Sequence, residues 1–572
     1  MVFPGFLCLF LGGKNGLFLA RVGRRSAKNG LSMRFFFYLL DSCIFFFRSH
    51  NPKVIGSNPF PATRKNPSDN RPGDFLLHFL FLLSLIIEKI LFLIYYVAIK
   101  GGAFVSDIYF IQNRWKLEGK NLYYYGLRNK DNLFKNNLRL SVKEAKVISK
   151  LPKELSDEEI KILKKFIGIQ IVTESELKQT PTSLKKAHFC KNCCANDYII
   201  PGLEFDENGL CPMCQTADDV KNLKSVVPIV KDIPKSKKSR FDVALFYTGG
   251  KDSTFLLYYL AKIKKLRVLA LTWEIPFISE SAKKSIENAK KHFSNVEFIT
   301  RSINNDDLSK IYKKLYELSK NTCACPSLAY ILFYPELVSN RVPYFMAGNE
   351  PVQMLGLYYN HMSPKFVYNL GENKIIPAIL NIGRILTFRP PLKNGQLQTL
   401  LSMHQLSGKS TKIMDFFGYS NPLVSNIVTA INEVPELLVP FKRALKQSSR
   451  TGNIPAFVHF DFNELCGGKY DWNKVKNILT EECGWVAPLE SKKALHTSCN
   501  IEKCKDHSQF VQFYNCKSKM IPFSAIEISL ASQNSLSSKE EIIYEMENLL
   551  GFSLDEIPEC SIMCDYLKEH YE

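Results

Sequence analysis

A short glycine-containing segment between two apolar runs carries the residues best suited to chemistry. The six residues TGGKDS, 248–253, follow the apolar run 242–247 and precede the apolar run 254–263. The glycines permit a sharp turn, and the N–H groups at the start of a following helix face negative charge. The terminal G-K-[ST] of a Walker A loop is missing, which excludes that loop. The G-x-G-x-x-G motif is also missing, which excludes a dinucleotide fingerprint. The segment therefore predicts a phosphate-binding loop of another type.

The elements that must position this loop alternate between strands and helices. Residues 242–247 form an apolar run typical of a buried strand, 267–273 and 296–301 read as further strands, and 281–293 reads as a helix. A further strand is expected to end just before Gly348. This alternation predicts an α/β fold with a doubly wound parallel sheet.

The loop resembles the S-G-G-x-D-S signature of the PP-loop ATP pyrophosphatases, with Thr248 in place of the first serine. The resemblance implies an adenine nucleotide alpha hydrolase-like fold and cleavage of ATP between the α and β phosphates. In that family the carbonyl oxygen of an acceptor attacks the α phosphorus and pyrophosphate leaves. A nitrogen or sulfur nucleophile then displaces AMP.

The same resemblance assigns roles to individual residues. It implies that Gly249, Gly250 and Ser253 contact pyrophosphate, that Asp252 binds Mg²⁺, and that the Thr248 hydroxyl contacts phosphate. It also places Thr272 beside adenine and Gly348 in the nucleotide or acceptor pocket. The candidate catalytic residues are Lys251, Asp252 and Ser253.

Four cysteines ahead of the loop have the spacing of metal ligands. They form two C-x-x-C pairs with seventeen residues between the pairs. Four thiolates so arranged fit tetrahedral zinc and leave no open position, which is typical of a structural site. We expect Cys194 to point away, and His188 is the alternative ligand. The predicted zinc-ribbon ligands are Cys190, Cys193, Cys211 and Cys214.

Three segments narrow the resemblance further: the ribbon, residues 272–288, and a C-terminal block over 470–504 and 528–546. Together they are similar to the N-acetyl sugar amidotransferases of bacterial surface-polysaccharide (lipopolysaccharide) synthesis. Those enzymes convert an acetamido group on a nucleotide-linked sugar into an acetamidino group. The chain contains no glutaminase motif, so this resemblance implies a separate glutaminase with an ammonia-channelling subunit.

A second set of thiols leaves a different nucleophile open. In sulfur-inserting PP-loop enzymes, a thiolate in the region of Cys323 and Cys325 carries persulfide or binds an iron–sulfur cluster. The alternative function is therefore a sulfurtransferase that thiolates a small molecule or a tRNA base, the one case in which nucleic acid is a partner. Packing is the other interpretation of these thiols, and the terminal Cys560 and Cys564 are expected to be buried or incidental. The candidates for a second metal site are Cys323, Cys325, Cys466, Cys499 and Cys504.

The first hundred residues differ from the rest. Residues 1–105 hold 13 Lys and Arg against 4 Asp and Glu, so their charge of +9 is almost half of the net charge of +20. The apolar run Phe75–Ile99 is long enough for a membrane anchor. However, Gly56–Pro59 matches a translated tRNA T-arm, and the surrounding runs resemble translated AT-rich DNA. We interpret 1–104 as an over-extended reading frame, with Val105 as the start.

Composition sets the remaining expectations. The 572 residues suggest several domains, and 16 cysteines with C-x-x-C spacing are typical of a reducing compartment, which predicts a cytoplasmic protein. The predicted divisions are a non-native or anchoring extension over 1–104, a winged-helix-like module over 105–185, the zinc ribbon over 186–218, the PP-loop domain over 240–372, a helical insertion over 373–450 and a helical C-terminal region over 451–572.

Overall fold

The computed structural model describes residues 108–132, 135–216, 228–320, 324–360, 375–408, 422–489, 499–534, 537–549 and 559–571. The chain divides into two compact units, Met1–Phe104 and Val105–Glu572, and every described residue belongs to the second. The predicted extension 1–104, with its apolar run, lies outside the described residues. Within the described ranges, none of the helices is both long and apolar enough to cross a bilayer.

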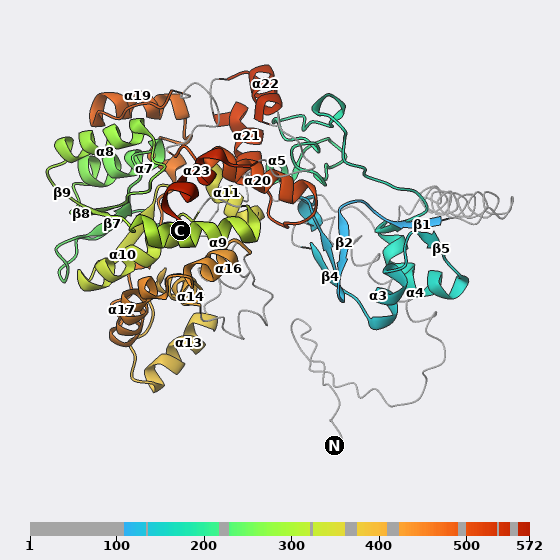
Figure 1. The fold of residues 1–572 in the computed structure, drawn as a ribbon, viewed down its shortest axis with the longest axis horizontal. Coiled ribbons are helices and arrows are strands. Elements are labelled where there is room, and N and C mark those ends of the chain that lie inside the picture. Colours follow the sequence, from blue (N-terminus) through green and yellow to red (C-terminus); the bar gives the residue numbers. More distant parts are fainter. Residues whose placement is uncertain are drawn as a thin grey trace, which may run out of the picture. The chain divides into compact units, whose positions relative to one another are not determined.

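A five-stranded parallel sheet lies in the second unit (Figure 1), with the strand order β11-β10-β7-β8-β9. β7 and β8 are buried along their whole length, as expected for parallel strands that are covered on both faces. The order reverses between β7 and β10, which is the topological switch point of the sheet. The strands are β7 (Val243–Phe246), β8 (Val268–Trp273), β9 (Val296–Arg301), β10 (Tyr344–Ala347) and β11 (Ala456–Phe457).

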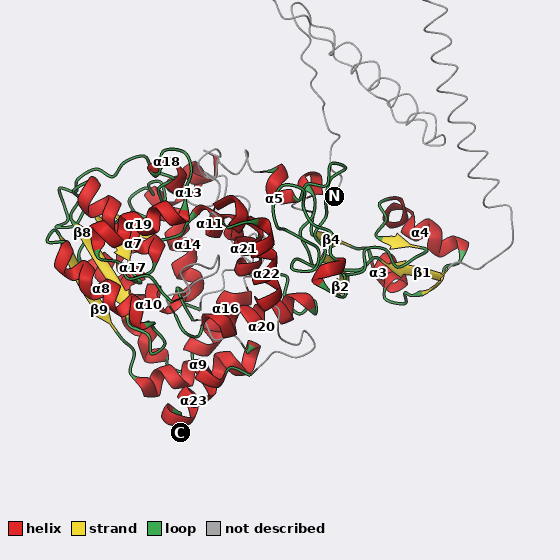
Figure 2. Ribbon diagram, turned by 90° about the horizontal axis from the view of Figure 1, so that it is seen from above, coloured by secondary structure: helices red, strands yellow, loops and turns green. Residues whose placement is uncertain are grey.

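Helices cover both faces of this sheet (Figure 2). They are α7 (Lys251–Tyr258), which continues into a π-helical turn η3 (Tyr259–Ile263), α8 (Glu280–His292), α9 (Asn305–Ser319) and α10 (Ser327–Ser339). Val243 and Leu245 of β7 pack in one core with α7 and α8, whereas Ala244 and Phe246 pack in a second core with α9 and α10. This alternation confirms the doubly wound α/β sheet.

The segment that precedes the ribbon forms two small three-stranded sheets and two helices. Each helix begins at a serine whose side chain forms a capping box with the glutamate three residues on, Ser141 with Glu144 and Ser156 with Glu159. The elements are β1 (Ile108–Ile111), β2 (Trp115–Glu118), β3 (Asn121–Tyr124), η1 (Lys130–Asn132), β4 (Asn137–Arg139), α3 (Val142–Ile148), β5 (Lys153–Glu154), α4 (Asp157–Gly168) and β6 (Val172–Thr173).

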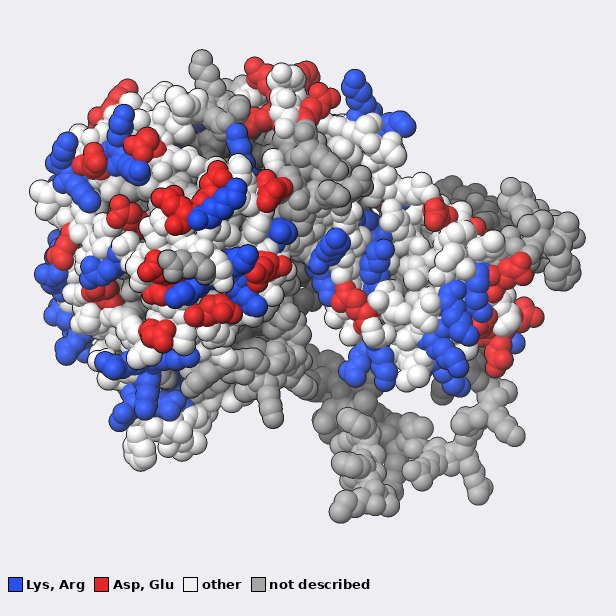
Figure 3. All heavy atoms as spheres, in the orientation of Figure 1, with Lys and Arg blue, Asp and Glu red and all other residues white. Residues whose placement is uncertain are grey.

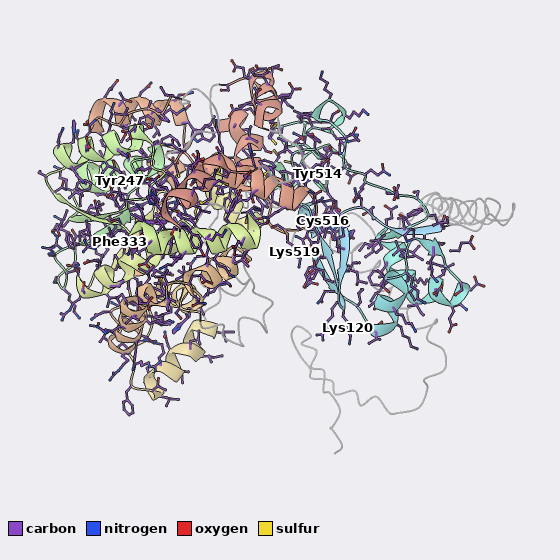
Figure 4. All side chains as sticks on the ribbon, viewed as in Figure 1. Lys120, Tyr247, Phe333, Tyr514, Cys516 and Lys519 are labelled. Carbon is purple, nitrogen blue, oxygen red and sulfur yellow. A yellow bond between two sulfur atoms is a disulfide. The ribbon has the colours of Figure 1, made fainter. Side chains whose placement is uncertain are left out.

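A buried arginine joins this segment to the C-terminal helices. The Arg114 guanidinium donates to the carbonyl oxygens of Phe513 and Tyr514 at 2.7 and 2.6 Å, and to that of Tyr125 at 2.5 Å. Tyr514 and Lys519, labelled in Figure 4, come from the end of α20 (Glu502–Tyr514) and the loop that follows. A cation is well placed at the C-terminal end of a helix, where carbonyl groups lack helical partners.

Apart from β11, the remaining regular elements of the described chain are helices. β11 follows the segment 373–450, so the predicted PP-loop domain 240–372 omits one strand of the sheet, because two residues are too short for a recognisable pattern. The remaining elements are η2 (Leu184–Lys186), α5 (Pro212–Gln215), α11 (Pro351–Tyr359), α13 (Ile375–Leu386), α14 (Gln396–Leu406), α16 (Pro422–Ile431), η4 (Pro435–Leu437), α17 (Leu438–Thr451), α18 (Phe462–Leu465), α19 (Trp472–Cys483), α21 (Phe523–Asn534), α22 (Lys539–Leu549) and α23 (Ser561–His570).

Candidate active site and metal centre

The predicted phosphate loop connects β7 to α7. Tyr247, labelled in Figure 4, ends the buried run and is followed by the loop. Gly249 has φ +73°, and a Cβ there would lie 2.5 Å from the carbonyl oxygen of Ala282. Gly250 is the N-cap residue of α7. Only glycine allows both the positive φ and the close approach of a carbonyl group at position 249. The sharp turn predicted from the two glycines is therefore confirmed.

Two hydroxyl groups close the loop onto the first turn of α7. The Oγ1 of Thr248 and the Oγ of Ser253 lie 3.1 Å apart, and the Thr248 amide donates to the Ser253 Oγ at 3.3 Å. The Gly250 amide donates to the Thr248 Oγ1 at 3.4 Å. The hydroxyls and amides of the loop therefore lie around one turn at the N-terminal end of a helix, where the helix dipole favours an anion.

The segment after β10 packs directly against this turn. A Cβ at Gly348 would lie 2.5 Å from both the amide nitrogen and the Cα of Ser253, so the glycine is required by close backbone approach. The next residue, Asn349, accepts a 2.6 Å hydrogen bond at its carbonyl oxygen from the Nε2 of buried His459. Burial lowers the pKa of His459 to about 4. The ends of β7 and β10 thus meet at the switch point, where ligands of such sheets bind.

Lys251 lies inside the protein beneath the loop. Its Nζ lies 2.5 Å from the Oδ1 of Asp252, 3.1 Å from the Oε2 of Glu350 and 3.2 Å from the hydroxyl of Tyr470. The same Asp252 oxygen accepts a 2.5 Å hydrogen bond from Tyr470. The lysine is 4% exposed, so its ammonium group lies against these carboxylates and not at the loop surface. The predicted catalytic role of Lys251 stays a prediction.

The charges around Lys251 favour its protonated form beside Asp252. Burial lowers the pKa of Lys251, but the charges of Asp252 and Glu350 outweigh burial and the net pKa is raised. Burial raises the pKa of Glu350 to about 7, against the opposing effect of Lys251. Burial, with Asp252, also raises the pKa of Tyr470 far above its usual range. The phenol therefore stays protonated and donates to Asp252.

Aromatic residues far along the chain complete the surroundings of the loop. The Lys251 ammonium lies 4.6 Å from the ring centroid of Tyr470 and 5.3 Å from that of Trp472. The indole nitrogen of Trp485 donates to the Gly249 carbonyl oxygen at 3.2 Å. Sequence reasoning did not assign these residues to the site. They belong to the C-terminal block 470–504, whose resemblance was the one available signal.

Thr272 lies at the end of β8, beside the loop. Its hydroxyl is buried and donates to the carbonyl oxygen of Tyr247 at 3.0 Å, so it ties β8 to the start of the loop. The predicted adenine contact of Thr272 stays a prediction.

The four predicted ribbon cysteines come together. The Sγ atoms all lie within 4.8 Å of one another, with Cys190 to Cys214 at 3.8 Å and Cys193 to Cys211 at 3.6 Å. Backbone amides donate to two of them: that of Cys211 to the Cys190 Sγ at 3.3 Å and that of Ala195 to the Cys193 Sγ at 3.4 Å. Such N–H···S contacts stabilise thiolates, and the spacing fits one tetrahedral metal.

The neighbours of the cluster lie where the spacing predicted. Cys194 points away from the four thiols and donates to the Ser532 hydroxyl at 3.4 Å. His188 is outside the cluster, and its Nδ1 lies 2.9 Å from an Asp197 carboxylate oxygen. The cysteine set 190, 193, 211 and 214 is therefore complete without a histidine.

Cys504 is not available to the second metal site that was considered. It is paired with Cys560 in a disulfide, with 5.6 Å between the Cα atoms, and Cys560 is buried as expected. Among the described residues, the ribbon is the one group of three or more cysteines, histidines or carboxylates close enough to share a metal. Cys323 lies outside the described residues, so a site that includes it stays a prediction.

Cys325 lies after β9 in the sequence, between α9 and α10, and is exposed.

No protein-family model matches the chain, and no curated protein matches it. Among solved structures, one match is the U34-tRNA thiolase NcsA from Methanococcus maripaludis with its [4Fe-4S] cluster. It is 14% identical, covers 45% of this chain and 88% of its own, and has a TM-score of 0.19.

Proposed function

We propose that the chain is a PP-loop ATP pyrophosphatase that adenylates a carbonyl acceptor and releases pyrophosphate. The observation that carries this proposal is the position of the TGGKDS loop at the switch point of a parallel sheet, with the end of β10 packed against it. A loop of amides and hydroxyls at this place is suited to the triphosphate of ATP.

The loop residues would act on the charge that develops on the departing pyrophosphate. The amides near Gly249 and Gly250 and the hydroxyls of Thr248 and Ser253 would donate to its oxygens, and donors held in place before the reaction are a large catalytic contribution. Asp252 is suited to hold Mg²⁺, because Lys251 and Tyr470 both bind its Oδ1 and leave Oδ2 for the ion. The bound Mg²⁺ would neutralise phosphate charge.

For the second half-reaction we favour nitrogen transfer to the acetamido group of a nucleotide-linked sugar. The acceptor oxygen would form a bond to the α phosphorus as the bond to pyrophosphate breaks. Ammonia would then form the new C–N bond at the activated carbon, and the oxygen would depart with AMP. The support is the resemblance of the ribbon, the 272–288 segment and the C-terminal block. Ammonia would come from a separate glutaminase subunit.

The products decide the reaction class. We expect AMP and pyrophosphate in equal amounts when the full chain is incubated with ATP, Mg²⁺, ammonium and a nucleotide-linked acetamido sugar, because the α–β bond is the one that breaks. Chromatography of the nucleotides with a pyrophosphate assay measures this. A sugar without the acetamido group is the control and should give no AMP. ADP with inorganic phosphate as products would contradict the proposal.

Replacement of the two neighbouring thiols separates nitrogen transfer from sulfur transfer. The double variant Cys323→Ser with Cys325→Ser should keep its rate of AMP formation with ammonium, because ammonia attacks without a protein thiol. Cys516→Ser is the matched control, since it removes a partly buried thiol elsewhere. Loss of turnover in the double variant alone would instead favour a sulfurtransferase that uses persulfide at these residues.

A further inference from the structure

Helix α13, Ile375–Leu386, exposes several large apolar side chains among those that the structure describes. Ile379, Ile382 and Leu386 are 63%, 59% and 75% exposed and follow one another at helical spacing. A surface helix of a soluble protein normally buries its apolar face and exposes its polar face. In α13 this arrangement is reversed.

Polar residues hold the opposite side of α13 to the protein. Asn381 exchanges two hydrogen bonds with the backbone of Leu392, at 2.7 Å to its Oδ1 and 3.3 Å from its Nδ2. Arg384 donates to the carbonyl oxygens of Pro390 and Ser449 at 2.8 and 3.0 Å. These four bonds fix the rotation of the helix, so its apolar side is held outward.

An aromatic residue extends this apolar side beyond the end of the helix. Phe388 is 97% exposed and has φ +55°, a backbone conformation that a bulky side chain rarely adopts. The amide of Phe388 donates to the Ile385 carbonyl oxygen at 3.0 Å, and that of Arg389 to the Arg384 carbonyl oxygen at 2.8 Å. The left-handed cap therefore directs the ring into solvent.

A basic pocket of about 680 Å³ opens beside Phe388, between the end of α13 and helix α17. Its lining includes Arg389, Arg443, Lys446 and Arg450 and contains no acidic residue. The last three follow one face of α17, at spacings of three and four residues. Figure 3 shows Lys and Arg side chains gathered there, next to the uncharged surface of α13.

We infer that α13 and this basic pocket, together the α13 face, dock the protein on an anionic membrane surface. The apolar side of α13 would enter the boundary between headgroups and acyl chains, and the pocket would take the phosphate of an anionic lipid. Twelve residues span about 18 Å as a helix, too short to cross a bilayer of ~30 Å. The pattern is that of a helix lying in the plane of the interface.

The basic charge of the α13 face and its apolar side together favour a membrane over two other occupants, a second copy of the chain and a small soluble anion. A second copy of this chain presents the same Arg443, Lys446 and Arg450, and their like charge opposes self-association through this cationic face. A small soluble anion would use the pocket but would leave the apolar side of α13 in water. An anionic bilayer satisfies both parts of the α13 face at once.

The test is sedimentation of the full chain with vesicles of phosphatidylcholine alone or with 30% phosphatidylglycerol. The mixed vesicles should bind the chain at least roughly tenfold better, and the advantage should fall at high salt. The double variant R443E with K446E, and separately Ile385→Ser with Phe388→Ser, should lose most of that binding. Matched controls are K290E with K291E on α8 and Ile263→Ser, an apolar residue that is 51% exposed outside the α13 face.

A local readout keeps the test independent of the rest of the chain. In the variant Phe388→Trp, brominated acyl chains in the mixed vesicles should quench the fluorescence of the new indole. The wild-type protein should show little quenching, since its four tryptophans are buried. Pyrophosphate release in solution should be unchanged in all α13-face variants.

Three outcomes would overturn the inference. The first is equal binding by wild type and α13-face variants, without extra quenching at position 388. The second is dimerisation in the absence of lipid that the same variants abolish, which would identify a self-interface. The third is that the wild-type chain binds inorganic pyrophosphate but no vesicles, and that R443E with K446E abolishes the pyrophosphate binding. This outcome would identify a site for a soluble anion.

Discussion

The Asp252→Asn variant should remain folded and release pyrophosphate roughly 10²- to 10³-fold more slowly than the wild-type chain. The substitution removes the negative charge that is suited to Mg²⁺ and keeps the side-chain volume. Lys251 retains Glu350 as a buried partner at 3.1 Å, so no buried cation is left without a carboxylate. Pyrophosphate release at saturating Mg²⁺ and ATP measures the rate, and circular dichroism measures folding.

Asp565→Asn is the control for this prediction, because it removes the same charge from an exposed position on α23. The control should release pyrophosphate at the wild-type rate. An Asp252→Asn chain with unchanged melting midpoint and undiminished release would remove Asp252 from the active site. It would also remove the main support for Mg²⁺ at the loop.

The loop and the ribbon could be predicted because each is encoded by neighbouring residues. A strand, two glycines and a helix start follow one another within residues 242–263, and the steric demand at Gly249 is local apart from the Ala282 carbonyl. The two C-x-x-C pairs likewise specify their own geometry. Local sequence determines local turns, so these predictions needed no knowledge of the rest of the fold.

The surroundings of Lys251 could not be predicted in the same way. Its partners are 99 and 219 residues away in the sequence, at Glu350 and Tyr470. Spacing along the chain gives no information on such contacts, because they depend on how β10 and the C-terminal block pack. A lysine in a phosphate loop suggests contact with phosphate, whereas here packing turns it inward to hold Asp252.

Two further features were beyond sequence reasoning for related reasons. Cys504 and Cys560 are 56 residues apart, and their pairing depends on the packing of α20 and the segment before α23. The residues of α13 are apolar at helical spacing, which predicts a helix and usually a buried face. Which side faces the protein is decided by Asn381 and Arg384, whose partners lie outside the helix.

Removal of the ribbon metal should unfold the ribbon and destabilise the chain. We expect one zinc per chain, lost in Cys193→Ala and after chelation, with a fall of the melting midpoint by at least about 5 °C. The reason is that the ribbon packs on the C-terminal helices: the Cys194 amide donates to the Ser529 carbonyl oxygen at 2.9 Å, and Lys539 donates to that of Cys190 at 3.1 Å. Elemental analysis and thermal melts measure both effects.

Cys194→Ala is the matched control, since this buried thiol lies next to a ligand but outside the cluster. It should keep its zinc and nearly all of its stability, because only the weak contact with Ser532 is lost. Iron in place of zinc would show that the four thiolates hold a redox-active centre. A chain that is free of metal, fully folded and active would show that the cluster is not structural. Four thiolates without an open position cannot polarise a substrate, so we expect any loss of turnover after zinc removal to follow the loss of folding.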